Sequence, residues 1–564
     1  IELNYAVAPW MDVLYRVGMY SSTDEVRNFT NKYEAEGTRN TPGSVSDQSL
    51  FYRRLNSDLI ISLKKDFGDF SNRLLLGQNI RTDYRKTQNV SASNLLYTDI
   101  INPDSRQGEL GGGSGITEQR SLAVYGEYVA GYKDLLFVTF TGRNDWISTL
   151  SKENRSFFYP GVSASLVASE AIPALRQIRK LSFAKIYTSW NKTGNVTLSP
   201  YQLNNAYSQS NGFPFGNSIG FLPGLTNPNP NIQPEFVTSF EAGFQLGMFN
   251  HRLYVDGAYV YSDADGQISN ANISRATGYN AMLVNSGRMT NNIIELSVSG
   301  DVVRTMDWNF NLGFNFTYTN NVVRELYGGA EFRQNFRQSY AFVGDQFPML
   351  WVSDYQRTPD GRVVVDAETG DPLVAPDNVK LGPMVPPYMM GINSRIDYKG
   401  FSLAAQFDWR MGGWFYSETI PPMYEFGTHP ITAAYGREAF VWPNSVIETS
   451  PGVFVENTSL TTSGGGKEFW TRQGAVQSNT AAKADFFKLR ELSLSYTVPA
   501  TLLQGQKIFR EASVGVVATN LFIITHSSNN IGDPEYLYNN TDGYYSFRQV
   551  PPMRTIGFTV NASF

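Results

Sequence analysis

Between Trp308 and Tyr318 the chain reads W-N-F-N-L-G-F-N-F-T-Y, in which large apolar side chains alternate with small or polar ones at every step. Because successive side chains of a β-strand point to opposite faces, the pattern predicts a strand with one apolar and one polar face. About eleven residues of tilted strand cross the hydrocarbon core of a bilayer, and Trp and Tyr are favoured at the two interfaces. The stretch is therefore typical of a strand that stands in lipid.

One such strand also fits a half-buried strand of a soluble antiparallel sandwich, so repetition of the pattern decides between the two folds. The same alternation recurs along the whole chain, for example in residues 253–261, 294–298, 401–409 and 556–564. Alternation and turn residues together predict seventeen strands. They lie near residues 1–7, 12–20, 52–65, 72–83, 119–130, 135–144, 160–168, 182–191, 236–247, 253–262, 293–303, 308–318, 388–397, 400–411, 487–498, 512–522 and 552–564.

The joins between these strands form a second pattern, because short joins alternate with long ones from one end of the chain to the other. Bacterial outer-membrane barrels combine short periplasmic turns with long extracellular loops, whereas a soluble sandwich has no reason to keep its long loops at one end. The sequence therefore predicts an all-β fold, a transmembrane antiparallel β-barrel. If the C-terminus lies at the periplasmic face, the strand count is odd; since bacterial single-chain barrels have even counts, we expect at least one missing N-terminal strand.

Composition agrees with this class and excludes several others. The 564 residues include 41% hydrophobic residues, 32 Tyr and 37 Phe, and no apolar run approaches the length of a membrane helix. The absence of Cys and the three scattered histidines, His251, His429 and His526, exclude thiol nucleophiles and make a zinc site improbable. A net charge of −5 gives no footprint for nucleic acid. The first residues already read as a strand rather than as a secretion signal.

Several motifs resemble the barrel of SusC/RagA-type TonB-dependent outer-membrane transporters, and their order and spacing match from the first strand to the last. They are Tyr125-Gly126-Glu127-Tyr128, Gly142-Arg143-Asn144-Asp145-Trp146, residues 153–163, residues 227–235, residues 238–243, residues 398–403, residues 489–496 and Asp533-Pro534-Glu535.

The resemblance implies that residues 1–564 are the C-terminal part of a 22-stranded receptor barrel, with about 17 of the 22 strands present. The plug domain, the TonB box and the first strands are expected to be missing from this sequence. The resemblance also implies a location in the Gram-negative outer membrane, a SusD-like surface lipoprotein as a lid, and contact with the TonB complex through the missing N-terminal region. Outer-membrane lipid, lipopolysaccharide and a glycan or peptide substrate are the other expected partners, and no nucleic acid is expected.

No catalytic site is expected, because no nucleophile elbow, phosphate loop or zinc spacing occurs in the sequence. Ligand or partner contacts are predicted for aromatic residues of the outer loops, although each could instead pack loop against loop or against a lid. They are Phe213, Phe215, Trp351, Tyr355, Trp414, Tyr416, Trp442, Trp470, Tyr536, Tyr538 and Tyr544.

Charged residues on the strands can form structural ladders or line a substrate path, and the ladder is favoured. They are Arg143, Asp145, Glu241, Glu295, Asp408, Arg410 and Glu491. Glycine-rich residues 111–115 and 464–466 are expected to be flexible loop. No cofactor is expected, but one weak calcium site is conceivable because oxygen ligands cluster near the end of the chain, although an ordinary turn is favoured. Its residues are Asp533, Glu535, Asn540 and Asp542.

The function predicted is TonB-energised import of a large nutrient, an oligosaccharide or an oligopeptide, beneath a SusD-like lid. We expect the lid to contact the loops of residues 192–236 and 319–387. The alternative is a barrel that serves as a structural or docking subunit of a larger outer-membrane assembly or secretion complex, since a fold does not fix a function. A passive porin is weakest, because a barrel of this width without a plug would leak.

Overall fold

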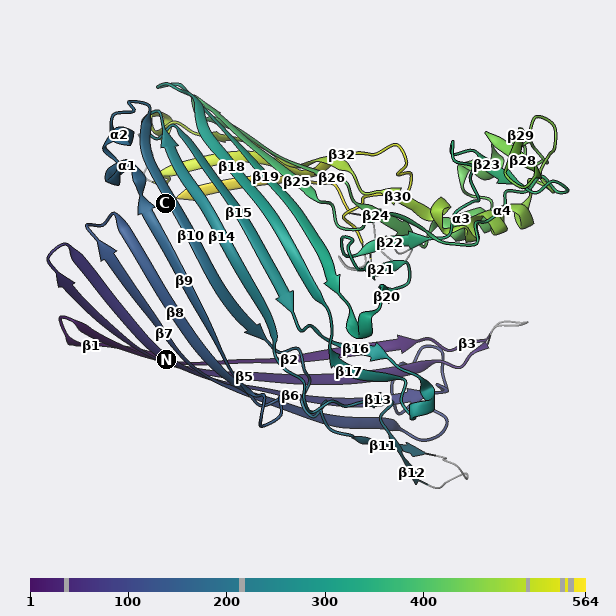
Figure 1. The fold of residues 1–564 in the computed structure, drawn as a ribbon, viewed down its shortest axis with the longest axis horizontal. Coiled ribbons are helices and arrows are strands. Elements are labelled where there is room, and N and C mark those ends of the chain that lie inside the picture. The colour runs from purple at the N-terminus through teal and green to yellow at the C-terminus, as the bar shows by residue number, and fades with distance from the viewer. Residues whose placement is uncertain (35–39, 212–218, 504–507, 538–542, 546–551, 564) are drawn as a thin grey trace. The chain divides into compact units, whose positions relative to one another are not determined.

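The computed structural model describes residues 1–34, 40–211, 219–503, 508–537, 543–545 and 552–563 (Figure 1). Seventeen strands belong to one antiparallel sheet. They are β1 (Glu2–Ala8), β2 (Met11–Thr30), β5 (Ser44–Phe67), β6 (Phe70–Ser93), β7 (Gly111–Tyr132), β8 (Leu136–Ile147), β9 (Ser156–Val167), β10 (Leu181–Asn195), β14 (Glu235–Met248), β15 (Leu253–Asp265), β18 (Arg288–Arg304), β19 (Trp308–Glu325), β25 (Tyr388–Tyr398), β26 (Phe401–Met411), β31 (Phe486–Thr497), β32 (Glu511–Thr525) and β34 (Thr555–Ser563). Each of the seventeen predicted strands is confirmed.

The predicted alternation of short and long joins is also confirmed. Tight turns such as Lys399-Gly400 connect most of the strand pairs at one end, and both residues have the positive φ that a two-residue hairpin turn requires, at 44° and 91°. The joins from β9 to β10 and from β31 to β32 are longer, at residues 168–180 and 498–510. The opposite ends carry the long connections. Among the described residues, no helix is long and apolar enough to cross a membrane.

Four strands are far longer than the alternation predicted. β2, β5, β6 and β7 have 20, 24, 24 and 22 residues, about twice the length that a tilted strand needs to cross a bilayer. Residues 111–115, predicted to be flexible loop, are instead the first residues of β7 and pair with β6. Glycine suits Gly112 because β6 and β7 lie close together at this position. A Cβ on Gly112 would lie 2.6 Å from the carbonyl oxygen of Asn89.

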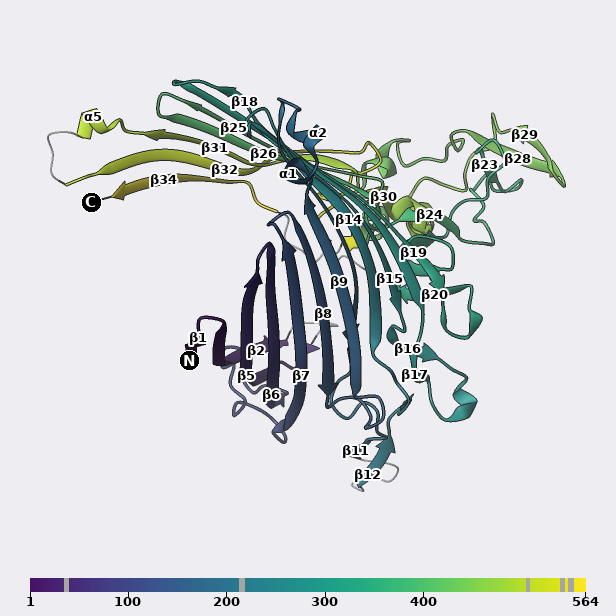
Figure 2. The same cartoon turned by 60° about the vertical axis from the view of Figure 1, so that its left-hand side comes forward.

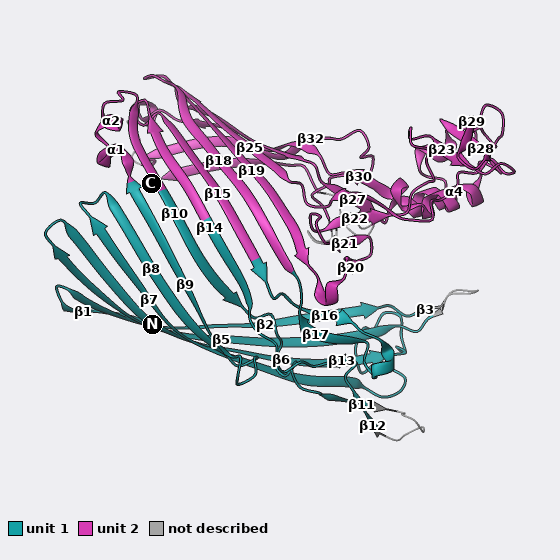
Figure 3. Ribbon diagram, viewed as in Figure 1, with its two compact units in different colours: residues 1–166, 187–240, 264–287 teal, residues 167–186, 241–263, 288–564 magenta. Residues whose placement is uncertain are grey.

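The chain divides into two units, coloured separately in Figure 3. Unit 1 comprises residues 1–166, 187–240 and 264–287. Its main feature is an antiparallel meander of seven strands (Figure 2). In the order β1, β2, β5, β6, β7, β8 and β9, each strand pairs with the one named after it. Its short elements are β3 (Tyr33–Glu34), β4 (Asn40–Thr41), β11 (Tyr207–Asn211), β12 (Ile219–Pro223), β13 (Thr226–Asn227), β16 (Ile268–Asn272), β17 (Ala281–Asn285) and η1 (Arg275–Thr277).

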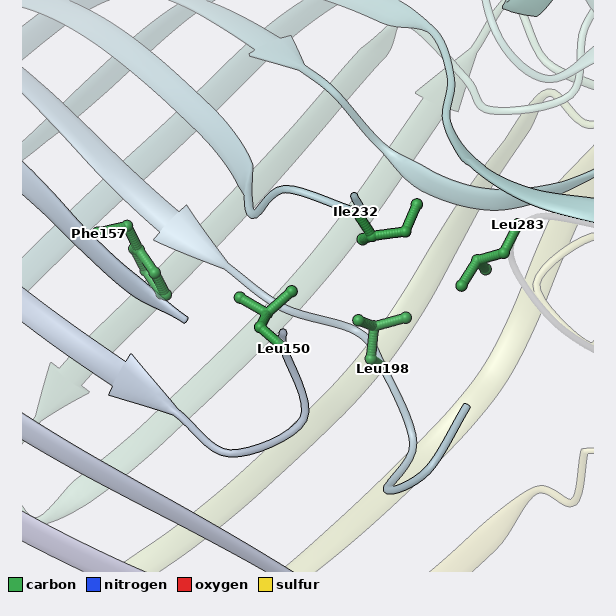
Figure 4. Packing of buried hydrophobic residues seen from close by; sticks show 5 residues of the cluster. All are labelled: Leu150, Phe157, Leu198, Ile232 and Leu283. Atoms are coloured by element: carbon green, nitrogen blue, oxygen red, sulfur yellow. The ribbon is translucent and has the colours of Figure 1, made fainter. Parts of the chain in front are cut away.

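Residues of the long connections of unit 1 pack together in a small hydrophobic core. Leu150, Phe157, Leu198, Ile232 and Leu283 converge there from five separate stretches of chain (Figure 4). Ile232 is fully buried at 0% exposure, and its carbonyl oxygen accepts a hydrogen bond of 3.1 Å from the Nδ2 of Asn154. This packing gives residues 227–235 a structural role.

Unit 2 comprises residues 167–186, 241–263 and 288–564. Its meander runs through β18, β19, β25, β26, β31, β32 and β34. Its short elements are α1 (Ala168–Ala171), α2 (Pro173–Arg176), η2 (Tyr327–Gly329), β20 (Phe332–Phe336), β21 (Ser339–Phe342), β22 (Met349–Val352), β23 (Val363–Val365), β24 (Val379–Pro383), β27 (Trp414–Ser417), α3 (Ile420–Glu425), η3 (Pro430–Ala433), β28 (Ser445–Ser450), β29 (Val453–Glu456), α4 (Lys467–Ala475), η4 (Gln477–Thr480), β30 (Ala481–Lys483), α5 (Ala500–Leu503) and β33 (Tyr544–Tyr545).

Aromatic pairs mark two levels on the β19–β25 ladder. Trp308 stacks on Tyr398 with ring centroids 4.1 Å apart, and ten residues further on Tyr318 lies 5.1 Å from Tyr388. Ten residues of strand rise about 33 Å, which at a tilt of about 40° is a height of about 25 Å, the apolar band of an outer-membrane barrel. On the polar face between these levels, Asn311 donates a hydrogen bond of 3.1 Å to Asp301.

Candidate functional site

The long connections of unit 2 fold together into one body, which we call the loop assembly and define as residues 326–387, 412–485, 526–537 and 543–545. Its central strand is β27, which pairs antiparallel with β30 and parallel with β33. Since β33 belongs to the last loop and β27 to the preceding one, the two loops are held together by backbone hydrogen bonds. The loops therefore form a folded structure of their own.

Buried aromatic residues form the cores of the loop assembly. In one core Leu350, Val352 and Met384 of the first loop pack on Tyr416 and Tyr544. Another core gathers aromatic rings around α3 and α4, which lie at the right of Figure 1. It contains Ile420, Tyr424, Phe440, Phe469 and Trp470.

Several hydrogen bonds connect the first loop of the assembly, residues 326–387, to the second loop, residues 412–485. The Oη of Tyr355 donates to the Oε1 of Gln473 at 2.8 Å and accepts from the Nδ2 of Asn479 at 2.6 Å. Burial of the ring raises the pKa of Tyr355 well above its usual range, so this hydroxyl stays protonated. The neighbouring Asp354 accepts from Ser478 at 2.7 Å and from Arg357 at 3.1 Å. Burial raises the pKa of Asp354, but these hydrogen bonds outweigh it and leave the pKa below its usual value.

A second link between the same loops is made by one carboxylate. Asp371 accepts hydrogen bonds from the amide and hydroxyl of Ser463 at 2.8 and 2.7 Å, and from Arg472 Nη2 at 2.7 Å. Such charge-assisted contacts are stronger than neutral ones and fix geometry. The assembly is thus held by polar as well as apolar contacts.

The last loop is anchored to the strands by an ion network. Lys488 Nζ of β31 lies 2.6 Å from Asp533 and 3.3 Å from Glu535. Arg490 of β31 and Arg410 of β26 also pair with Glu535, the latter at 2.8 Å. Burial raises the pKa of Glu535, but its hydrogen bond to Arg490 and the nearby cations outweigh that effect and lower the pKa overall. This carboxylate is therefore held ionised.

The predicted ligand-binding aromatic residues occupy two kinds of position. Tyr355, Tyr416, Trp470 and Tyr544 are buried inside the loop assembly. The half-buried ones, which leave part of the ring accessible, are Trp351, Trp414, Trp442 and Tyr536. Phe213, Phe215 and Tyr538 lie outside the described residues. Ligand contact by any of these side chains stays a prediction.

The calcium prediction also stays untested. Asp533 and Glu535 lie together, with their charges facing the cations of the ion network, whereas Asn540 and Asp542 lie outside the described residues. Within the described ranges, no group of three or more His, Cys, Asp and Glu side chains could hold a metal ion.

Several predicted strand charges belong to ladders. Arg143 pairs with Asp145 at 2.8 Å on β8, and Asp145 also accepts from Tyr159 of β9. Asp408 accepts from Arg490 at 2.6 Å. Arg410, also predicted, pairs with Glu535 of the last loop. Arg337, which stacks 4.9 Å over the ring of Tyr544, was not predicted because it has no local sequence signal.

Two of the pockets in the described part of the chain combine an aromatic ring with charged groups among the outer connections. One, of 430 Å³ in unit 1, is lined by polar side chains such as Glu118 and Arg120 and by Tyr201. The other, of 250 Å³ in the loop assembly, lies beside Trp470, Arg437 and Lys467. Both combine an aromatic ring with charged groups, which suits a polar organic ligand.

A long antiparallel sheet with aromatic residues at two levels and large folded loops at one end defines an outer-membrane β-barrel. The chain matches the family model described as TonB dependent receptor-like, beta-barrel, over residues 3–521. It therefore belongs to this family.

Individual relatives agree. TonB-dependent receptor P26 of Formosa agariphila is 24% identical over 93% of this chain and 54% of its own length. TonB-dependent receptor SusC of Bacteroides thetaiotaomicron is 24% identical over 47% of this chain and 28% of its own length. The RagAB peptide importer in its open-open state superimposes with a TM-score of 0.80 at 17% identity, over 100% of this chain and 60% of that chain. The chain spans about half the length of the first of these relatives.

Proposed function

We propose that the protein containing this chain imports a large nutrient, an oligosaccharide or an oligopeptide, across the outer membrane, with energy supplied through TonB. The observation that carries the proposal is the correspondence of the whole chain with the barrel of a peptide importer, RagAB, at a TM-score of 0.80. The similarity to SusC and to other TonB-dependent receptors supports the same class of function.

The folded loops suit this function. A large, hydrated substrate needs aromatic faces and polar groups, and the rings of Trp351, Trp414 and Trp442 are only half-buried, so part of each ring is accessible to such a substrate. The loop assembly also offers a folded platform for a SusD-like lid, and we expect the lid to contact the loops of residues 192–236 and 319–387.

The test is uptake by cells that carry the full-length gene, a deletion of the gene, or a deletion of its TonB-interacting segment. Labelled oligopeptides and labelled oligosaccharides are supplied separately. We expect one substrate class to enter only cells with the intact gene, and copurification to recover a surface lipoprotein. Unchanged uptake of both classes in the deletion strains, together with recovery of secretion or assembly components, would instead support a docking subunit.

A further inference from the structure

An open groove of 370 Å³ lies on unit 2 at the end of the strands that carries the tight turns. Gly300 of β18 lines it together with Leu253 of β15 and Leu312 of β19. A Cβ on Gly300 would lie 2.6 Å from the carbonyl oxygen of Arg252, so the position is closed to larger residues. Leu312 belongs to the apolar face of β19 and pairs with Gly300, which places the groove on the lipid-facing side of the sheet.

The groove has a basic rim. Arg252 lines it and is exposed, and in the described part of the chain its Nη2 donates only to the main-chain oxygen of Asp301, at 3.3 Å. Phe249, also on the rim, donates its amide to the oxygen of Lys180 at 2.8 Å, and Lys180 Nζ lies 5.8 Å from the centre of its ring. Among the described residues, no carboxylate pairs with Arg252 or Lys180. Asp301 also lines the groove, but its carboxylate accepts a hydrogen bond from Asn311 and pairs with Arg304, which compensates its charge.

At two other tight turns of the sheet a lysine also lies over an aromatic ring, but there a carboxylate neutralises its charge. Lys133 lies over Tyr132 and 3.3 Å from Asp69. Lys399 lies 5.5 Å over Tyr398 and 3.5 Å from Asp307. The rim of the groove therefore presents positive charge that those turns do not.

The depth of the groove matches a lipid headgroup region. Trp308 begins β19 and marks the interface level on this side, and Leu312 of the groove lies four residues further along the same strand, two positions deeper on the same face. Tight turns of outer-membrane barrels face the periplasm, and the leaflet on that side consists of glycerophospholipids. An arginine and a lysine beside an apolar groove at this level match the phosphate and the acyl chain of such a lipid.

We propose that this groove binds an anionic glycerophospholipid of the periplasmic leaflet. One acyl chain lies along Leu253, Val298 and Leu312 over Gly300, and the phosphate is bound by Arg252 and Lys180. The proposal depends on the location of the chain in the membrane and is independent of the nutrient that the protein imports.

The test is native mass spectrometry of the full-length protein, delipidated in mild detergent and supplied with phosphatidylglycerol or phosphatidylcholine. We expect retention of phosphatidylglycerol by the wild type and at least a tenfold loss in the double variant Arg252→Gln, Lys180→Gln. Val298→Trp, which fills the groove without changing charge, is expected to lose the lipid as well. Lys399→Gln is the matched control, because it removes a turn lysine that already has a carboxylate partner.

Each variant is first checked for native folding by its heat-dependent migration on gels. Retention of phosphatidylglycerol by the double variant or by Val298→Trp would overturn the proposal, as would equal retention of phosphatidylcholine by the wild type. A loss in Lys399→Gln as large as in the double variant would do the same, because it would show only a general effect of charge.

Discussion

Lys488 illustrates how a single buried charge can hold a loop. Its side chain is 5% exposed and that of Asp533 is 7% exposed. Removal of the ammonium group therefore leaves buried carboxylates with less positive charge to balance their negative charge. Breaking such a buried pair costs about 3–5 kcal/mol. We expect Lys488→Met to release residues 526–537 from β31, measured as faster proteolysis of this loop in the full-length protein. Lys467→Met is the control: its pair with Glu425 is exposed and 3.6 Å long, and such pairs contribute about 0–1 kcal/mol. Equal proteolysis of both variants would contradict the role of Lys488.

The carboxylates of the loop assembly predict its response to acid. Glu535 and Asp354 have lowered pKa values in the folded state. A lowered folded pKa contributes stability that is present above the unfolded pKa, about 4.3 for Glu and 3.9 for Asp, and is lost as pH falls through the folded value. We expect the protection of amides in the loop assembly, measured relative to their intrinsic exchange rates, to fall below about pH 4 while the meander strands stay protected. Glu535→Gln should flatten this acid response, and an unchanged profile in that variant would count against the assignment.

At the scale of the element, the strands were predictable because each has one apolar and one polar face between the aromatic levels. The outer halves of β2, β5, β6 and β7 could not be predicted, because residues such as 21–25 are polar on both faces and show no alternation of apolar and polar side chains. Neighbouring strands nevertheless supply their backbone hydrogen bonds, which is why they continue. The loop assembly was equally hidden from the sequence, because its contacts join residues as far apart as Tyr355 and Asn479, separated by 124 positions.

Two adjacent glycines test the unpredicted part of β7. A side chain on Gly112 would meet the carbonyl oxygen of Asn89 at 2.6 Å, whereas a side chain on Gly113 would meet nothing within 4 Å. We therefore expect Gly112→Ala to open the outer β6–β7 pairing, seen as faster amide exchange there. Gly113→Ala should be neutral or stabilise the strand by about 0.5–1 kcal/mol, because Gly in a strand costs entropy. The same exchange rate in both variants would show that the close strand approach is not what selects Gly112.

At the scale of the whole molecule, the two aromatic levels and the lipid-facing stripe between them require that β19 stand in the membrane with Phe314 near its middle. A charged residue on the lipid face near the midplane costs about 2–4 kcal/mol, whereas the polar face tolerates it. We expect Phe314→Arg to lower the yield of folded, heat-modifiable protein in lipid vesicles and to lower its unfolding midpoint in denaturant. Asn315→Arg, one residue further along the same strand, places the same charge on the opposite face and should fold nearly as well as the wild type. If Asn315→Arg were the more damaging of the two, the faces of β19 would be assigned the wrong way round. The lipid-facing position of the groove at Gly300, which is inferred from Leu312 on that same face, would then be lost with it.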